Sequence, residues 1–145
     1  MALRAPQYTE LSMLHDAHGA PLLRQLYNPA EQLLYCQWFG NLTPETVITA
    51  ARANLAVLQK LHAPLLLNDK TVATGDWTEA MPWVEFEWAP LAHEYGLRAF
   101  AYVFAPDVHN QLAALEVFTL ARQQLAVCLF HNVETARAWL RQQLR

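Results

Sequence analysis

The stretch L-L-L-N-D-K-T-V-A-T-G-D-W, residues Leu65 to Trp77, begins as a leucine run and ends as a polar cluster. Its apolar part, Leu65 to Asn68, is too short and too cleanly bounded for a helix, so we predict a buried strand. The residues before it, His62-Ala63-Pro64, end a helix, because proline cannot continue one. A helical pattern resumes at Asp76, which places the strand between two helices.

The same alternation extends in both directions. Thr43-Pro44-Glu45-Thr46 is typical of a helix start, with Thr43 as the N-cap, and the helical spacing continues to about Leu61. Beyond Asp76, Pro82 suits the first turn of a new helix, Pro90 should kink it, and Gly96 should end it. The other predicted elements are strands at Tyr8–His15, Leu22–Tyr27, Leu33–Phe39, Arg98–Phe104 and Leu125–Phe130, and helices at Asn110–Gln124 and Glu134–Leu144 with Asn132 as a cap.

Strands that alternate with helices predict right-handed crossovers and a parallel sheet, to which the N-terminal hairpin adds an antiparallel edge. We therefore expect an α/β fold with a mixed, largely parallel sheet of five to six strands and four helices. No repeat or linker divides the chain, so residues 1–145 are expected to form one domain.

Composition excludes several classes of protein. Hydrophobic residues make up 54% of the 145 residues and charged residues 16%, which suits a packed core. The net charge is −3 and no basic run occurs, so no nucleic-acid partner is expected. The N-terminus lacks a signal-like apolar core and no apolar run spans a membrane, which predicts a cytoplasmic protein without membrane insertion.

The residue types that hold metals or cofactors form no recognisable pattern. Cys36 and Cys128 lie in separate apolar runs, outside any C-x-x-C pair, and are expected to be buried reduced thiols. The six histidines show no metal-ligand spacing. We expect neither a metal nor a cofactor.

The polar cluster after the leucine run has three interpretations. Asp69 and Asp76 would accept backbone N–H bonds and cap the loop and the next helix, which we favour. A regulatory loop is the second, in which Thr71 or Thr74 takes a phosphate beside these acids. A catalytic site is the third, but no base and nucleophile form a known signature. Lys70 is interpreted as a solvated loop charge.

The helix from Asp76 to Tyr95 carries more aromatic residues than one buried face requires. A stripe spaced three and four residues apart should pack on the sheet. Trp83 and Phe86 fall outside this stripe and, beside Pro90, form a candidate interface. The alternative is that the N-terminal hairpin or the helix itself covers them. The stripe consists of Trp77, Met81, Val84, Trp88, Leu91 and Tyr95.

A third group of aromatic residues suggests a pocket under the helix. Trp38, Trp88, Phe100 and Phe104 could line a small apolar pocket there. The simpler alternative, which we favour, is that these rings fill the core.

Four segments resemble the STAS-like proteins related to the anti-sigma-factor antagonist of sporulating bacteria, which are similar in architecture to lipid-binding CRAL-TRIO domains. The resemblance runs from Leu33 to the C-terminus. It implies a mixed sheet packed with helices and a bacterial, regulatory role without catalysis. The segments are W-F-G-N-L-T-P-E-T (38–46), L-L-L-N-D (65–69), W-V-E-F-E-W-A-P-L-A-H-E-Y-G-L-R-A-F-A-Y-V (83–103) and L-F-H-N-V-E-T-A-R-A-W-L (129–140).

The chain departs from this family at one motif. Antagonists switched by phosphorylation carry D-S-S-G after the equivalent strand, whereas this chain reads N-D-K-T-V-A-T-G-D-W there. No serine is present, and the nearest hydroxyls are those of Thr71 and Thr74. We therefore expect a non-enzymatic interaction module that forms a homodimer through Pro82 to Tyr95. The alternative is a carrier of a small apolar ligand or lipid.

Overall fold

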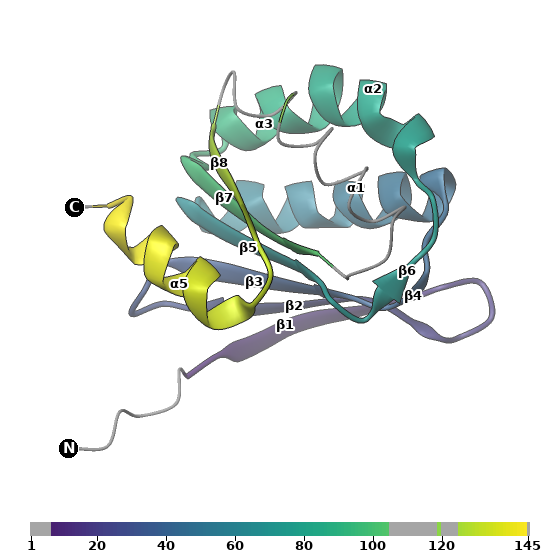
Figure 1. Ribbon diagram of the computed structural model, residues 1–145, viewed down its shortest axis with the longest axis horizontal. Helices are drawn as coiled ribbons and strands as arrows, with labels where there is room; N and C mark the ends of the chain where they lie inside the picture. The colour runs from purple at the N-terminus through teal and green to yellow at the C-terminus, as the bar shows by residue number, and fades with distance from the viewer. Residues whose placement is uncertain (1–6, 105–118, 120–124, 145) are drawn as a thin grey trace.

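The computed structural model is an α/β structure in which helices cover both faces of a six-stranded mixed sheet (Figure 1). It describes residues 7–104, 119 and 125–144. The strand order is β1-β2-β3-β5-β7-β8. The predicted α/β class and mixed sheet are confirmed, with six strands in this sheet among the described residues.

The first three strands form the antiparallel half of the sheet. They are β1 (Thr9–His15), β2 (Pro21–Asn28) and β3 (Leu33–Trp38), and each pairs with the next. The β2–β3 turn is closed by the Asn28 side chain, whose Oδ1 accepts the N–H of Glu31 at 3.1 Å. This is the local bond by which asparagine favours turns.

The other three strands of the sheet are parallel. β5 (Leu65–Lys70) lies between β3 and β7 (Ala99–Phe104), and β8 (Ala126–Phe130) forms the far edge. Beside the carboxyl ends of β3 and β5, a short parallel pair joins β4 (Gly40–Asn41) to β6 (Ala73–Thr74). β5 runs two residues further than the predicted strand, which changes the environment of Asp69 and Lys70.

Helix α1 (Pro44–Leu61) begins and ends as its sequence predicts. Thr43 and Thr46 form a capping box, in which Thr46 N–H donates to Thr43 Oγ1 at 3.2 Å and Thr43 N–H donates to Thr46 Oγ1 at 2.9 Å. These bonds satisfy two backbone donors at the start of the helix. His62 ends it in a left-handed conformation, with a φ of 52°.

The predicted aromatic helix is a composite segment, named here the α2–α3 segment. It consists of η1 (Thr78–Ala80), α2 (Met81–Trp83), a π-helical turn η2 (Val84–Trp88) and α3 (Ala89–Glu94). Pro90 has no N–H to give to the carbonyl four residues earlier. The π turn lies directly before it, and Ala89 N–H donates to the Val84 carbonyl, five residues back.

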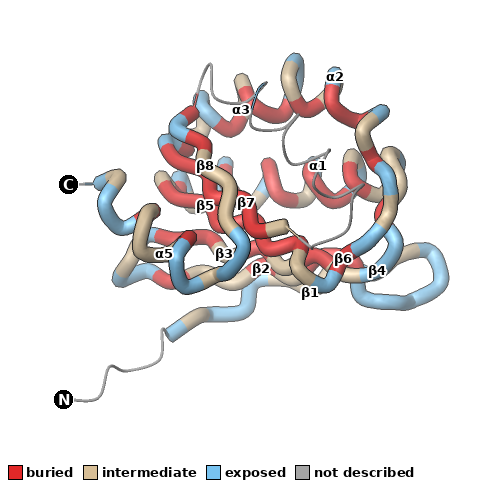
Figure 2. The backbone as a smooth tube through the Cα atoms, in the orientation of Figure 1, coloured by how far each residue is buried: buried red, intermediate tan, exposed pale blue. Residues whose placement is uncertain are grey.

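Two hydrophobic cores lie on opposite faces of the sheet. α1 and the α2–α3 segment cover one face, and α5 (Val133–Gln142) covers the other (Figure 1). The inward sides of these helices and the central strands are buried (Figure 2). Asn132 caps α5 as predicted, because its Oδ1 accepts Thr135 N–H at 2.8 Å. The core under α5 is small and contains Leu33, Leu65, Leu67, Ala99, Ala101, Val103, Ala136 and Leu140.

The predicted total of four helices is not settled by the described residues. The structure describes α1, the α2–α3 segment and α5, whereas the helix predicted at Asn110–Gln124 falls outside the described residues apart from Thr119.

Candidate functional site

The carboxyl end of β5 carries three consecutive polar residues, Asn68, Asp69 and Lys70, and all three are buried. Side chains alternate between the two faces of a strand. Asn68 and Lys70 therefore share the face covered by α1, and Asp69 points to the other face. Lys70 is only 2% exposed, so its interpretation as a solvated loop charge is wrong.

Three aromatic rings surround the Lys70 amine. Its Nζ lies 3.2 Å from the ring centroid of Trp77, 4.5 Å from that of Trp38 and 5.3 Å from that of Tyr102. No carboxylate forms an ion pair with Lys70 among the residues that the structure describes.

Burial lowers the pKa of the Lys70 amine well below its ordinary value. Contacts with aromatic faces favour the charged form by about 0.5–2 kcal/mol each. Removing an ammonium ion from water without a counter-charge costs several kcal/mol, which opposes these contacts. We infer an amine that loses its proton much more readily than an exposed lysine.

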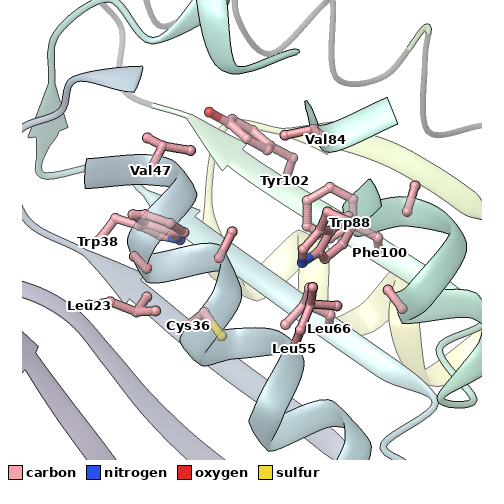
Figure 3. Packing of buried hydrophobic residues seen from close by; sticks show 14 of the residues in the cluster. Leu23, Cys36, Trp38, Val47, Leu55, Leu66, Val84, Trp88, Phe100 and Tyr102 are labelled. Carbon is pink, nitrogen blue, oxygen red and sulfur yellow. The ribbon is translucent and has the colours of Figure 1, made fainter. Parts of the chain in front are cut away.

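A cavity of about 40 Å³ lies beside this amine, between the sheet and the helices. Leu66, Asn68 and Lys70 of β5 line it from the sheet, and Val47 and Ala51 line it from α1. The rings of Trp38, Tyr102, Trp88 and Phe100 also line it, and Figure 3 labels them among the packed apolar side chains. This space, named here the Lys70 cavity, lies near the carboxyl end of a parallel strand, where α/β proteins commonly bind ligands.

Hydrogen-bond donors are the second polar feature of the Lys70 cavity. Trp38 Nε1–H donates to Asn68 Oδ1. Within the described part of the chain, the amide nitrogen of Asn68 has no acceptor. Trp77 lines the same cavity, and its buried indole N–H likewise lacks an acceptor among these residues. The cavity therefore offers one amine and unused donors inside an otherwise apolar wall.

A buried network around Asn54 supports the α1 side of the cavity. Its Oδ1 accepts the Trp88 indole N–H at 3.0 Å, and its Nδ2 donates to Gln25 Oε1 at 3.2 Å and to Cys36 Sγ at 3.4 Å. These bonds tie α1 to the sheet and to the π turn. Burial raises the pKa of the Cys36 thiol, which makes it a poor nucleophile.

The loop after β5 contains the acids predicted to act as caps. Asp69 Oδ1 accepts the N–H of Thr71 at 3.0 Å and its hydroxyl at 2.7 Å, while Asp69 Oδ2 accepts the Tyr35 hydroxyl. Asp76 Oδ1 accepts the N–H of Thr78 at 3.1 Å and its hydroxyl at 2.6 Å. The predicted backbone bonds of both acids are therefore confirmed, but Asp76 is not the cap of the next helix, because η1 begins at Thr78 with Trp77 at its N-cap position.

The two candidate phosphorylation sites differ in their environments. Thr71 is half-buried, and its hydroxyl is bonded to Asp69. Thr74 is exposed, and its hydroxyl donates to Asn41 Oδ1 at 3.3 Å across the β4–β6 pair.

The three candidate interface residues are not equally exposed. Phe86 is 72% exposed, the largest exposed fraction among the exposed large hydrophobic residues that the structure describes. Trp83 is half-buried against the core, and the Arg52 guanidinium lies 5.7 Å from its ring centroid. Pro90 is half-buried. The outward surface of the α2–α3 segment is therefore centred on Phe86.

Three of the four residues expected around an apolar pocket line the Lys70 cavity, namely Trp38, Trp88 and Phe100. Phe104 does not belong to this lining and is half-buried, with its ring centroid 4.8 Å from that of His131.

Comparisons with known proteins add no relative. No family model matches the chain, no curated protein matches it, and no solved structure matches it. Among the described residues, no helix has the length and apolar character needed to cross a membrane. The same residues contain no group of three or more His, Cys, Asp or Glu side chains able to hold a metal ion.

Sequence reasoning missed the polar residues of the Lys70 cavity, although signals for them exist. Leu66, Asn68 and Lys70 are spaced two apart, so they share one strand face if the strand continues beyond Asn68. Asn54 occupies a position of the apolar stripe of α1, where a polar residue needs a buried partner.

Proposed function

We propose that this chain is a cytoplasmic, non-enzymatic interaction module of the STAS-like type that forms a weak homodimer through the outward surface of the α2–α3 segment. The four motifs that resemble this family support the class of module. The exposure of Phe86 supports the surface and is the single observation that carries the proposal.

The π turn contributes to the exposure of Phe86. Within η2, Val84 and Trp88 are buried, while Phe86 between them faces outward. Single π turns inside α-helices occur frequently at functional sites, and here the turn displays a large ring beside a proline. Large exposed aromatic residues are also common anchors of protein interfaces.

Charges of both signs lie on or beside the α2–α3 segment, which favours a second copy of the same chain as the partner. Glu85 and Glu87 flank it in sequence, and Arg52 of α1 lies over the neighbouring ring of Trp83. In a two-fold contact the same patch meets itself, so the acids of one copy can face Arg52 of the other. A patch of one sign would repel its own copy.

The size of the surface predicts weak association. Burying Phe86 of both copies would remove about 300 Å² of apolar surface, equivalent to about 7 kcal/mol before association costs. Those costs are about 4–15 kcal/mol, and stable interfaces bury about 1,600 Å² in total. We therefore expect a dissociation constant in the micromolar range or weaker.

A charge-exchange experiment tests this arrangement by sedimentation velocity. Arg52→Glu alone and Glu85→Arg/Glu87→Arg alone should each sediment as monomers at concentrations where the wild type dimerises. Mixing the two variants should restore a dimer, because opposite charges then face each other. A wild type that stays monomeric at several hundred micromolar, or a mixture that stays monomeric, contradicts the proposal.

A small-ligand carrier is the second candidate, and the Lys70 cavity is the observation that favours it. A volume of about 40 Å³ holds about three water-sized atoms, so an acyl chain does not fit. A thermal-shift comparison of fatty acids with two- or three-carbon ligands separates the two cases. Stabilisation by the small ligands alone would support the carrier function in this restricted form.

A further inference from the structure

We propose that Lys70 is the attacking amine of a covalent binding site for small aldehydes in the Lys70 cavity. This site is independent of the Phe86 surface and goes beyond the interaction function proposed above. It captures its ligand reversibly as an imine, without turnover.

The first support is the position of the amine. Lys70 lines the cavity, its side chain is buried, and its Nζ is enclosed by the rings of Trp38, Trp77 and Tyr102. A desolvated lysine without a paired carboxylate is the usual form of a Schiff-base lysine, because only the unprotonated amine is a nucleophile. The direction of its pKa agrees with this role.

The second support is the match between the donors of the cavity and a carbonyl oxygen. Asn68 lies two residues before Lys70 on the same face of β5, about 6.6 Å away along the strand. Its one side-chain hydrogen bond among the described residues is accepted by Oδ1, and the buried Trp77 indole N–H has no acceptor among these residues. An aldehyde supplies an acceptor oxygen for these donors and an electrophilic carbon for the amine.

The chemical step is balanced without an oxidant, a reductant or a metal. The Nζ lone pair attacks the carbonyl carbon to form the C–N bond of a carbinolamine, and the carbonyl oxygen takes one N–H proton. The carbinolamine then loses its hydroxyl group with the second N–H proton as water, which leaves a C=N bond to Lys70. Addition of water reverses both steps and releases the aldehyde.

The size of the cavity limits the ligand. About 40 Å³ holds about three water-sized atoms, which corresponds to a two- or three-carbon aldehyde. An aromatic aldehyde such as benzaldehyde requires a cavity of roughly 150 Å³. We therefore expect discrimination by size.

The sequence provides an internal control, because Lys60 and Lys70 are its only lysines. Lys60 is exposed in the last turn of α1. The full-length protein is incubated with acetaldehyde and sodium cyanoborohydride near neutral pH, and ethylation of each lysine is followed by peptide mass mapping. We expect Lys70 to be labelled at least about ten-fold faster than Lys60, since an exposed lysine amine is almost fully protonated at that pH.

Further experiments test whether the folded cavity causes the faster labelling of Lys70. In urea the two lysines should react at equal rates, and benzaldehyde should label Lys60 of the folded protein but not Lys70. Asn68→Leu should slow labelling of Lys70, whereas Lys60→Arg should leave it unchanged. The proposal is overturned if folded Lys70 reacts no faster than Lys60, or if its advantage persists in urea. Both outcomes are read from the wild type, so they do not depend on the folding of a variant.

Discussion

Lys70 is the residue whose environment differs most from that of its residue type. Lysine is almost never fully buried without a partner, yet here it lies among aromatic rings at the end of a central strand. Such a group weakens the folded state, because the unfolded chain hydrates the ammonium ion and the folded chain does not. A residue that lowers stability in this way is consistent with a functional role.

Replacement of Lys70 by methionine should therefore stabilise the protein. Methionine has a similar length and no charge, so we expect Lys70→Met to raise the free energy of unfolding at pH 7 by about 1–3 kcal/mol. Urea denaturation of the two proteins measures this difference. Lys60→Met, at an exposed position, should change stability by less than about 0.5 kcal/mol.

The stability difference between the wild type and Lys70→Met should depend on pH, and the direction of this dependence follows from the pKa of Lys70. The pKa of Lys70 is lower in the folded than in the unfolded state, so the unfolded state binds the extra proton. The stability of wild type relative to Lys70→Met should be highest above the unfolded pKa of about 10.4 and should fall as the pH is lowered toward the folded pKa. A difference that stays constant from pH 7 to pH 10 would show that Lys70 keeps its proton when buried.

Asp69 and Asp76 make similar hydrogen bonds, but those of Asp69 are more buried. We therefore expect their replacement by alanine to lower the free energy of unfolding by different amounts. Asp69→Ala leaves the half-buried Tyr35 hydroxyl and Thr71 N–H without their acceptor, and should cost about 2–3 kcal/mol. Asp76→Ala removes an exposed side-chain bond to the Thr78 N–H and should cost about 1 kcal/mol. Thermal or urea unfolding of both variants measures the two values. Equal losses would mean that burial does not set the strength of these caps.

At this scale the sequence predicts caps better than it predicts burial. The bonds of Thr43, Asn132, Asp69 and Asp76 are local, so the residue types and their spacing suffice. Burial of Lys70 depends on β5 continuing to Lys70 and on Trp77 covering it from another segment. The sequence of the leucine run does not indicate that Trp77 will pack over Lys70.

At the scale of elements, the α2–α3 segment shows how one proline changes a helix. Of the predicted stripe, Trp77, Met81, Val84 and Trp88 are buried, whereas Leu91 and Tyr95 at its end are only partly buried against the core. The sequence does not reveal that the turn before Pro90 is π-helical, because the wider turn depends on packing and on the missing N–H together. The bounds of α1 are predicted to the residue, since both of its ends carry local signals.

Asn54 tests how α1 is held against the rest of the fold. Asn54→Ala removes the acceptor of the Trp88 indole N–H, which is then buried without a partner, and leaves Gln25 Oε1 with only the weak Cys36 thiol donor. We expect a loss of about 2–4 kcal/mol, measured by urea unfolding.

Gln59→Ala, at an exposed position in the same helix, is the matched control and should change stability by less than about 0.5 kcal/mol. If Asn54→Ala costs no more than this control, the network does not hold α1 in place.

At the scale of the whole molecule, the α2–α3 segment faces in two directions. Its inner side, with Trp77 directly before it, closes the Lys70 cavity through Val84 and Trp88, and its outer side displays Phe86. The order of the six strands of the main sheet and of the described helices follows from the sequence, because hydrophobic periodicity and turn residues mark them, whereas the short β4–β6 pair is not predicted. Which outer ring remains exposed could not be predicted, since Trp83 and Phe86 differ only in how α1 covers them.

The hydrodynamic mass of the protein as a function of concentration tests the central proposal, homodimerisation through Phe86, most directly. Sedimentation velocity of the wild type from low to several hundred micromolar should show a shift from monomer to dimer. Phe86→Ala should remain monomeric throughout, whereas Val72→Ala, which removes a side chain 57% exposed elsewhere, should dimerise like the wild type. A wild type that is monomeric at every concentration, or a Phe86→Ala variant that dimerises equally well, would contradict the proposed function.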